Sequence, residues 1–120
     1  MLIEFVASNF RSIKDEVVLT MLPENKIKDE TNLLLNTNIK QVPRLQKLAI
    51  IYGANASGKS NLLEAISVMR GIVLSSAKNT IKNQPLPYDP FKLNSLTLNE
   101  PTVFSVQFIA KDSIRYHYGF

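Results

Sequence analysis

Residues 53–60, GANASGKS, place two glycines, a lysine and a serine at spacings that suit phosphate chemistry. The segment satisfies the pattern G-x-x-x-x-G-K-[ST] at every fixed position. Gly53 allows a sharp turn, and Gly58 lets the backbone approach a phosphate because glycine has no Cβ. The N–H groups between the two glycines can form a nest around an anion. The pattern therefore predicts a site for the phosphates of a nucleoside triphosphate.

Two side chains at the end of this loop complete the predicted site. Lys59 can reach the β- and γ-phosphates, and the Ser60 hydroxyl can coordinate Mg²⁺, which makes Ser60 the predicted metal ligand. The alternative interpretation is a glycine-rich turn between a strand and a helix, with Lys59 exposed. The nucleotide-binding residues predicted from the loop are Gly53, Ala54, Asn55, Ala56, Ser57, Gly58, Lys59, Ser60 and Asn61.

The motif requires a buried strand before the loop and a helix after it, and the sequence predicts both. Residues 48–52, LAIIY, form an unbroken apolar run that is typical of a buried parallel strand. After the loop, apolar residues recur at spacings of three and four, which predicts an amphipathic helix of about four to five turns. Gly71 weakens the second half of this helix by about 1 kcal/mol relative to alanine, so we expect the helix to end or bend near it. The apolar positions are Leu62, Leu63, Ile66, Met69 and Val73.

Four further strands are predicted from short runs of β-branched and aromatic residues. Residues 2–10 and 16–21 are expected to pair as a hairpin around a polar bend. Residues 102–109 and 113–120 form a second predicted hairpin, connected at 110–112.

Polar insertions near residues 22–47 and 75–100 separate these elements. The prolines and asparagines of the first indicate a loop or a partly ordered insertion, and the prolines of the second exclude a helix or a central strand. The predicted fold is α/β of the P-loop NTPase type. It has a mixed sheet with antiparallel amino-terminal strands and a parallel strand before the loop. We expect residues 1–120 to be one lobe of a larger ATPase domain, because the chain ends inside a predicted strand.

Composition excludes several classes of site. The chain of 120 residues has no cysteine, so thiol catalysis, disulfides and cysteine-ligated zinc are excluded. His117 is the only histidine, which excludes a histidine-rich metal site and leaves no spare base for a serine triad. A lone histidine in a strand is more often a packing or surface residue than a catalytic base.

Charge and hydropathy bear on partners and location. The net charge of +4 favours phosphate or nucleic-acid partners slightly, although lysines on a solvated surface explain the same value. No signal peptide is visible, and no apolar run approaches the roughly 20 residues that span a bilayer. We therefore expect a cytoplasmic protein with no membrane partner.

Three segments together resemble a known group of proteins. These are NFRSIKD at residues 9–15, GANASGKSN at 53–61, and the strand pair PTVFSVQF and RYHYGF at 101–108 and 115–120. They resemble the amino-terminal end of prokaryotic ABC-like ATPases related to the chromosome-maintenance and RecF-type proteins. Such proteins are commonly described as AAA-family ATP-binding proteins of phage-defence or abortive-infection systems. The resemblance covers most of the chain outside the two polar insertions and implies a partial ABC-ATPase-like head lobe.

The resemblance implies ATP as the nucleotide and Mg²⁺ as its metal ion. It also implies a homodimer, in which two heads enclose two ATP molecules, and a DNA or nuclease effector as a possible partner. In that group the arginine of the NFRS segment lies near the phosphates, which corresponds to Arg11. The other interpretation of Arg11 is a solvated turn residue after the first strand.

Parts of the hydrolytic apparatus of that group are missing from this sequence. A Walker B motif needs about four apolar residues before Asp-Glu, and the pairs at 15–16 and 29–30 follow polar segments instead. Residues 74–77, LSSA, lack the glycines of a signature motif, and Gln84 and Gln107 are weak candidates for the glutamine between the lobes. We therefore expect the chain to bind ATP weakly or incompletely and to hydrolyse it negligibly, whereas the full-length protein would be an ATPase.

Other functional classes are less consistent with the sequence. A P-loop kinase would need a lid and arginines at an acceptor site, and a GTPase usually has an Asn-Lys-x-Asp motif, which residues 25–29 match only with one residue too many. A non-catalytic interaction module is the main alternative, although the intact Lys59 and Ser60 argue against it. Nucleic-acid binding by the first polar insertion is also possible, but nearby acidic residues favour an ordinary solvated loop. Its cationic residues are Lys26, Lys28, Lys40, Arg44 and Lys47.

Overall fold

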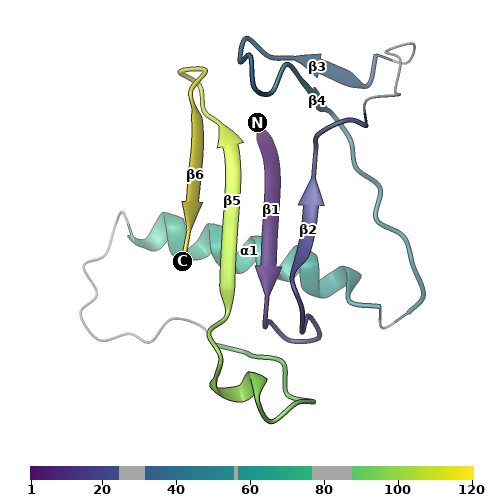
Figure 1. Ribbon diagram of the computed structural model, residues 1–120, viewed down its shortest axis with the longest axis vertical. Coiled ribbons are helices and arrows are strands. Elements are labelled where there is room, and N and C mark those ends of the chain that lie inside the picture. Colours follow the sequence, from purple (N-terminus) through teal and green to yellow (C-terminus); the bar gives the residue numbers. More distant parts are fainter. Residues whose placement is uncertain (25–31, 56, 77–87) are drawn as a thin grey trace. The chain divides into compact units, whose positions relative to one another are not determined.

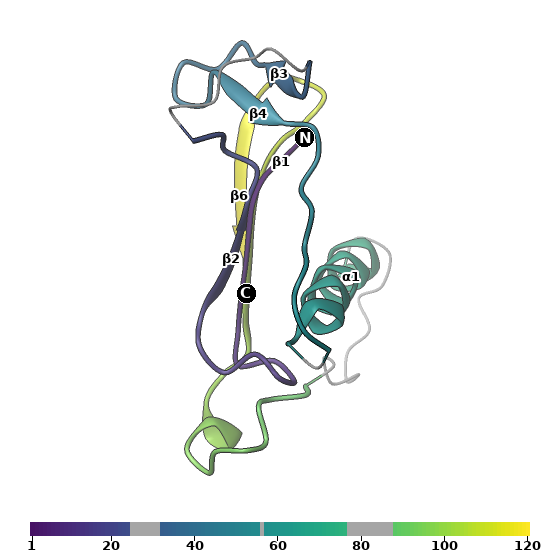
Figure 2. The same ribbon diagram turned by 90° about the vertical axis from the view of Figure 1, so that its right-hand side faces the viewer.

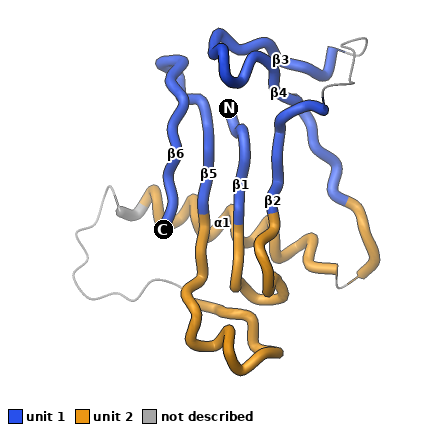
Figure 3. The backbone as a smooth tube through the Cα atoms, viewed as in Figure 1, with its two compact units in different colours: residues 1–6, 18–51, 105–120 blue, residues 7–17, 52–104 orange. Residues whose placement is uncertain are grey.

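The computed structural model describes residues 1–24, 32–55, 57–76 and 88–120. The chain divides into two compact units, which Figure 3 distinguishes by colour. Unit 1 comprises residues 1–6, 18–51 and 105–120, and unit 2 comprises residues 7–17 and 52–104.

One sheet contains four strands in the order β2-β1-β5-β6 (Figure 1). Neighbouring arrows in Figure 1 point in opposite directions, so the sheet is antiparallel. Both predicted hairpins are confirmed, since β1 lies beside β2 and β5 pairs antiparallel with β6. The strands are β1 (Leu2–Ser8), β2 (Val17–Thr20), β5 (Val103–Ile109) and β6 (Arg115–Gly119).

Unit 1 has a small apolar core to which a second, two-stranded sheet contributes. Strands β3 (Leu34–Asn36) and β4 (Arg44–Gln46) pair antiparallel, with Leu35 opposite Leu45. The Gln46 N–H donates to the carbonyl of Met21 at 2.8 Å. The buried residues of this core are Ile3, Val42, Leu45 and Ile109.

The first polar insertion was predicted to be a loop or a partly ordered insertion, and its described part contains β3 and β4, which the sequence did not indicate. Strands of three residues are too short to produce a recognisable alternation of apolar and polar residues. Their apolar residues instead take part in long-range packing, and Leu45 is almost completely buried. Residues 25–31 of the insertion lie outside the described residues.

The predicted parallel strand at residues 48–52 is also wrong. Figure 2 shows this run as a coil between β4 and the start of α1 (Lys59–Ser76). Ile50 is 77% exposed and Tyr52 is 90% exposed. An apolar run forms a buried strand only where neighbouring strands pair with it and both of its faces are covered. Among the described residues no strand pairs with this run, so both described sheets are antiparallel and the predicted mixed sheet is absent from them.

Helix α1 begins directly after Gly58, as predicted, and lies in unit 2. Leu62, Ala65 and Met69 are its buried apolar side chains, at spacings of three and four. The helix continues past Gly71 to Ser76 and therefore does not end near Gly71, whereas the predicted bend there stays a prediction. The second polar insertion therefore starts inside α1, and its residues 77–87 lie outside the described residues.

We predict that Gly71→Ala stabilises the protein by about 0.5–1 kcal/mol. Gly71 is exposed within the helix, and a Cβ added there would meet no atom within 4 Å. Alanine therefore gains helix propensity without a clash, and the midpoint of urea unfolding should rise. A lower or unchanged midpoint would show that the last turns of α1 are not helical in solution.

Candidate functional site

The loop at residues 53–60 is compact, and its last glycine has a conformation that other residues rarely adopt. Gly58 has φ +88°. Its carbonyl then accepts the Leu62 N–H at 3.0 Å, which is the first hydrogen bond of α1. Earlier in the loop, the Ser57 N–H donates to the Ala54 carbonyl at 3.3 Å. Ala56 lies outside the described residues.

The loop folds back so closely against Gly53 that a Cβ there would require the Ser57 side chain to move. A Cβ at this position would lie 2.9 Å from the Ser57 Oγ and 3.9 Å from the Lys59 Cδ. The two glycines of the motif thus have different structural roles. Gly53 leaves space for the Ser57 side chain, whereas Gly58 allows a positive φ.

The side chain of Lys59 bridges the two ends of the loop. Its Nζ donates to the Gly53 carbonyl at 2.8 Å and to the Ala54 carbonyl at 2.6 Å. A third contact, at 3.3 Å, reaches the Ser57 Oγ. These three oxygens match the three donors of an ammonium group. The contacts hold the positive charge of Lys59 at the loop rather than in bulk solvent.

A hollow of about 340 Å³ lies at this loop and at the first turn of α1. The first N–H groups of a helix have no intrahelical acceptor, and the helix dipole adds partial positive charge at the same end. The first turn of α1 contains no acidic residue that would oppose this charge. The hollow is therefore suited to an anion. Its lining residues are Ser12, Asn55, Ser57, Gly58, Lys59, Ser60 and Asn61.

Most of the loop residues predicted from the sequence are thus brought together. Gly53 and Ala54 do not line the hollow, but their carbonyls hold the Lys59 ammonium. The Ser60 hydroxyl, the predicted metal ligand, is exposed at the hollow.

Arg11 is not one of the residues that line the hollow. Its Nε donates to the Asp89 Oδ2 at 3.0 Å, and its Nη2 lies 3.9 Å from the Glu64 Oε1. The guanidinium also lies over the ring of Phe10, 5.4 Å from the centroid. Arg11 therefore engages two carboxylates of unit 2, and a role beside the phosphates stays a prediction.

The carboxylate of Asp89 is shared between two cations. A hydrogen bond from Lys92 is the main reason why the pKa of Asp89 lies below its usual value of 3.8. Burial opposes this shift, whereas the charge of Lys92 and the hydrogen bond and charge of Arg11 add to it. Asp89 is ionised at neutral pH and can neutralise Arg11.

Sequence reasoning missed Ser12, although it lies next to Arg11. Ser12 belongs to a tight turn in which Phe10 and Ile13 exchange two backbone hydrogen bonds, each 2.8 Å long. The Ser12 Oγ accepts a hydrogen bond from the Asn61 Nδ2 at 2.6 Å. It is also 3.2 Å from the position that a Cβ on Gly58 would occupy. The NFRS segment was a signal for Arg11, but nothing in it indicated that the serine reaches the loop.

The turn that carries Ser12 is anchored by the buried side chain of Asn9. Its Nδ2 donates to the carbonyls of Thr97 at 2.8 Å and Glu100 at 2.7 Å. Its Oδ1 accepts the Phe91 N–H at 3.0 Å, and its own carbonyl accepts the Thr102 hydroxyl at 2.7 Å. The short 3-10 helix η1 (Thr97–Asn99) is part of this arrangement. One amide group thus fixes the turn to the segment that precedes β5.

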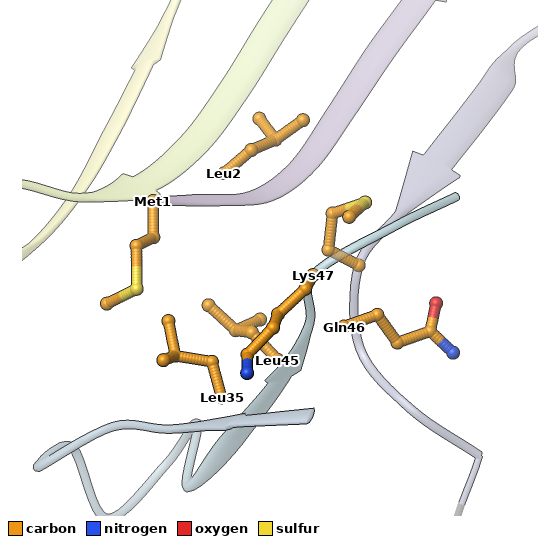
Figure 4. A pocket seen from close by; sticks show the side chains of 7 residues that line it. Met1, Leu2, Leu35, Leu45, Gln46 and Lys47 are labelled. Carbon is orange, nitrogen blue, oxygen red and sulfur yellow. The ribbon is translucent and has the colours of Figure 1, made fainter. Parts of the chain in front are cut away.

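A second hollow, of about 380 Å³, belongs to unit 1 (Figure 4). Its lining is mainly apolar, and Lys47 provides the only charged side chain among the residues that line it. The Lys47 Nζ donates to the carbonyl of Asn32 at 2.9 Å. This hollow lacks the converging polar groups of the first one. The lining residues are Met1, Leu2, Met21, Leu35, Leu45, Gln46 and Lys47.

Comparison with known proteins identified one family. A family model described as "AAA domain, putative AbiEii toxin, Type IV TA system" matches residues 48–120, which is more than half of the chain. Searches of curated proteins and of solved structures gave no match. Within the described part of the chain, no helix combines the length and apolar character needed to cross a membrane.

We predict that Asp89→Asn lowers stability at neutral pH by less than about 1 kcal/mol, because exposed ion pairs contribute little. The folded-state pKa of Asp89 is below 3.8, so the contribution of the carboxylate is present above pH 3.8 and is lost as the pH falls through the folded-state pKa. Urea unfolding of both proteins should differ at neutral pH and coincide well below pH 3.8. A difference that persists in acid would show that packing, rather than charge, is responsible.

Proposed function

The chain belongs to the AAA-domain family whose model matches residues 48–120, and from this we propose that its 53–60 loop binds ATP together with Mg²⁺. The family is of the P-loop ATPase type, and such proteins generally use ATP and Mg²⁺. The observation that carries the proposal is the hollow at the start of α1, where the Lys59 ammonium lies against the loop. The loop would then act as a Walker A motif.

The shape and charge of the hollow fit a chain of phosphates. A Cβ at Gly53 would crowd Ser57 and one at Gly58 would crowd Ser12, and the N–H groups of the first turn of α1 have no intrahelical acceptor. Its volume, about 340 Å³, is near the lower end of the range of about 300–1,000 Å³ for ligand pockets. This size suits the phosphate part of a nucleotide rather than the whole molecule.

Lys59 is already placed for such a ligand. Its Nζ is held by the uncharged carbonyls of Gly53 and Ala54, and hydrogen bonds between two charged groups are stronger than those to a neutral acceptor. A phosphate oxygen would therefore compete effectively for the ammonium. Only the end of the side chain needs to move, so little of the binding free energy would be spent on rearranging the backbone.

The residues of the site could bind Mg²⁺ only together with the phosphates of the nucleotide. Ser60 provides one hydroxyl, and no group of three or more acidic, histidine or cysteine side chains in the described ranges could hold a metal ion. Mg²⁺ is usually bound by one or two protein ligands together with phosphates and water. When bound, the ion would offset the negative charge of the phosphates.

Hydrolysis requires more than this hollow provides. An attacking water must be oriented, and charge that develops in the transition state must be stabilised. No carboxylate is among the residues that line the hollow, and Glu64, one turn into α1, lies within ion-pair distance of Arg11. We therefore expect this chain to bind ATP and to hydrolyse it negligibly.

We also propose a role for the ATP-binding domain in phage defence. The name of the matching family refers to an AbiEii toxin, which supports a role in phage defence. In this account the complete protein is an ABC-like ATPase, related to RecF-type and chromosome-maintenance proteins, that acts in the cytoplasm as a homodimer. It would switch a DNA-acting or nuclease effector when ATP binds between two heads.

One observation favours a second candidate function, which is nucleic-acid binding. Residues 32–47 of unit 1 carry Lys40, Arg44 and Lys47 but no acidic residue. Contacts with phosphate groups depend strongly on salt because they release counterions. If this segment binds DNA, the affinity should be measurable at low salt and should fall steeply as salt is added. Absence of binding at low salt would remove this candidate.

The proposal predicts that Lys59→Ala weakens ATP binding by at least about tenfold, because charge-assisted hydrogen bonds to phosphate are lost. Isothermal titration with ATP and Mg²⁺ measures this loss. Lys111→Ala is the matched control, since Lys111 is an exposed lysine of unit 1 with no part in the hollow. Release of inorganic phosphate should stay at background level in all three proteins.

Two outcomes would contradict the proposal. Equal affinity of the wild type and Lys59→Ala would place the nucleotide elsewhere on the chain. Absence of binding by the wild type would mean that the hollow does not hold phosphates in this chain.

A further inference from the structure

We propose that Ser12 is a further nucleotide-binding residue and that Asn61 positions its hydroxyl. The inference rests on the proposed function, because it concerns the same hollow. Ser12 comes from the Phe10–Ile13 turn, which lies far from the loop in the sequence, yet it lines the hollow together with the loop residues. The site is therefore built from two separate segments of unit 2.

The hydrogen bond between the two residues determines what Ser12 can offer a ligand. The Asn61 Nδ2 donates to the Ser12 Oγ at 2.6 Å. Because the oxygen accepts this hydrogen bond, the hydroxyl hydrogen points away from the Asn61 amide and is free to donate elsewhere. Within the described residues no acceptor receives it. The Ser12 hydroxyl is thus a donor that a phosphate oxygen can use.

The turn holds this donor in place at some conformational cost. Arg11 has φ +51° at the first central position of the turn, where glycine is usual in two-residue hairpin turns of this kind. Asn9, at φ +48°, is also left-handed, and its side-chain amide binds the carbonyls of Thr97 and Glu100. Two such residues within three positions are maintained by the hydrogen bonds of Asn9 and by the contact of Arg11 with Asp89. These contacts hold the turn, and with it Ser12, in one position.

The position of Ser12 also indicates which phosphates it would contact. Ser12 lies against the backbone of Gly58, whereas the Lys59 ammonium lies at Gly53 and Ala54. In loops of this type the backbone N–H groups surround the α- and β-phosphates, and the lysine reaches the β- and γ-phosphates. Ser12 would therefore donate to the α- or β-phosphate. Its contribution should be the same for ATP and for ADP.

The test is a titration of ATP and of ADP, each with Mg²⁺, into the wild type and a set of variants. Ser12→Ala should weaken both nucleotides by about tenfold, as expected when a hydrogen bond to a charged group is lost. Ser12→Thr keeps the hydroxyl and should restore binding to within about threefold of the wild type. Ser67→Ala is the matched control, because Ser67 is an exposed serine of α1 that does not line the hollow.

Variants of Asn61 provide a second test of the inference, and the single variants do not depend on the folding of Ser12→Ala. Asn61→Asp replaces the donor with an acceptor, so the Ser12 hydroxyl would turn toward the carboxylate and away from the ligand. We expect the loss caused by Asn61→Asp to be larger with Ser12 present than in Ser12→Ala, because repulsion between the carboxylate and the phosphates acts equally in both. The Ser12→Ala/Asn61→Ala double variant should lose clearly less than the product of the two single losses, because the two side chains act as a unit.

The outcomes separate this inference from the function on which it rests. Unchanged affinity in Ser12→Ala, or failure of Ser12→Thr to restore binding, would overturn the role of the hydroxyl. A loss confined to ATP would overturn the assignment to the α- or β-phosphate. If Ser12→Ala binds like the wild type while Lys59→Ala does not, the inference alone fails. If Lys59→Ala binds ATP like the wild type, the proposed function fails.

Discussion

The candidate site depends on one electrostatic interaction, between the Lys59 ammonium and the carbonyls of Gly53 and Ala54. These contacts draw the start and the end of the loop together around a single positive charge. Gly53 favours this closure because it has no Cβ that would crowd the Ser57 hydroxyl. Gly58 completes it by taking a positive φ just before α1 begins. The loop thus has its curled shape without a ligand and keeps a cation available for one.

A second segment of the chain contributes one residue, Ser12, to the lining of the hollow. The turn at residues 10–13 brings Ser12 to the loop, and the buried amide of Asn9 secures that turn. In the same turn, Arg11 forms ion pairs with Asp89 and Glu64 and is not among the residues that line the hollow. The charge of Arg11 is therefore balanced by carboxylates, whereas the charge of Lys59 is balanced only by uncharged oxygens. Of these two cations, Lys59 lines the hollow and Arg11 does not.

Local patterns in the sequence predicted local structure well. The glycine spacing predicted the loop, the apolar period predicted α1 from its first residue, and both hairpins of the antiparallel sheet were expected. Three features could not be predicted, because each depends on contacts between distant residues. The apolar run at 48–52 indicates a preference for burial, but the strand partners that would bury it are not found among the described residues. Strands β3 and β4 are too short to show a period, and the hydrogen bond from Asn61 to Ser12 joins residues 49 positions apart.

The central claim is that the loop at residues 53–60 receives the phosphates of ATP. Titration of the isotopically labelled chain with ATP and Mg²⁺, followed by the NMR signals of its backbone amides, tests this claim most directly. We expect saturable shifts of the amide signals of Gly58, Lys59 and Ser60, because their N–H groups would donate to phosphate oxygens. Shifts centred instead on the second hollow, at Leu35, Leu45 and Lys47, or no saturable shift at all, would contradict the account.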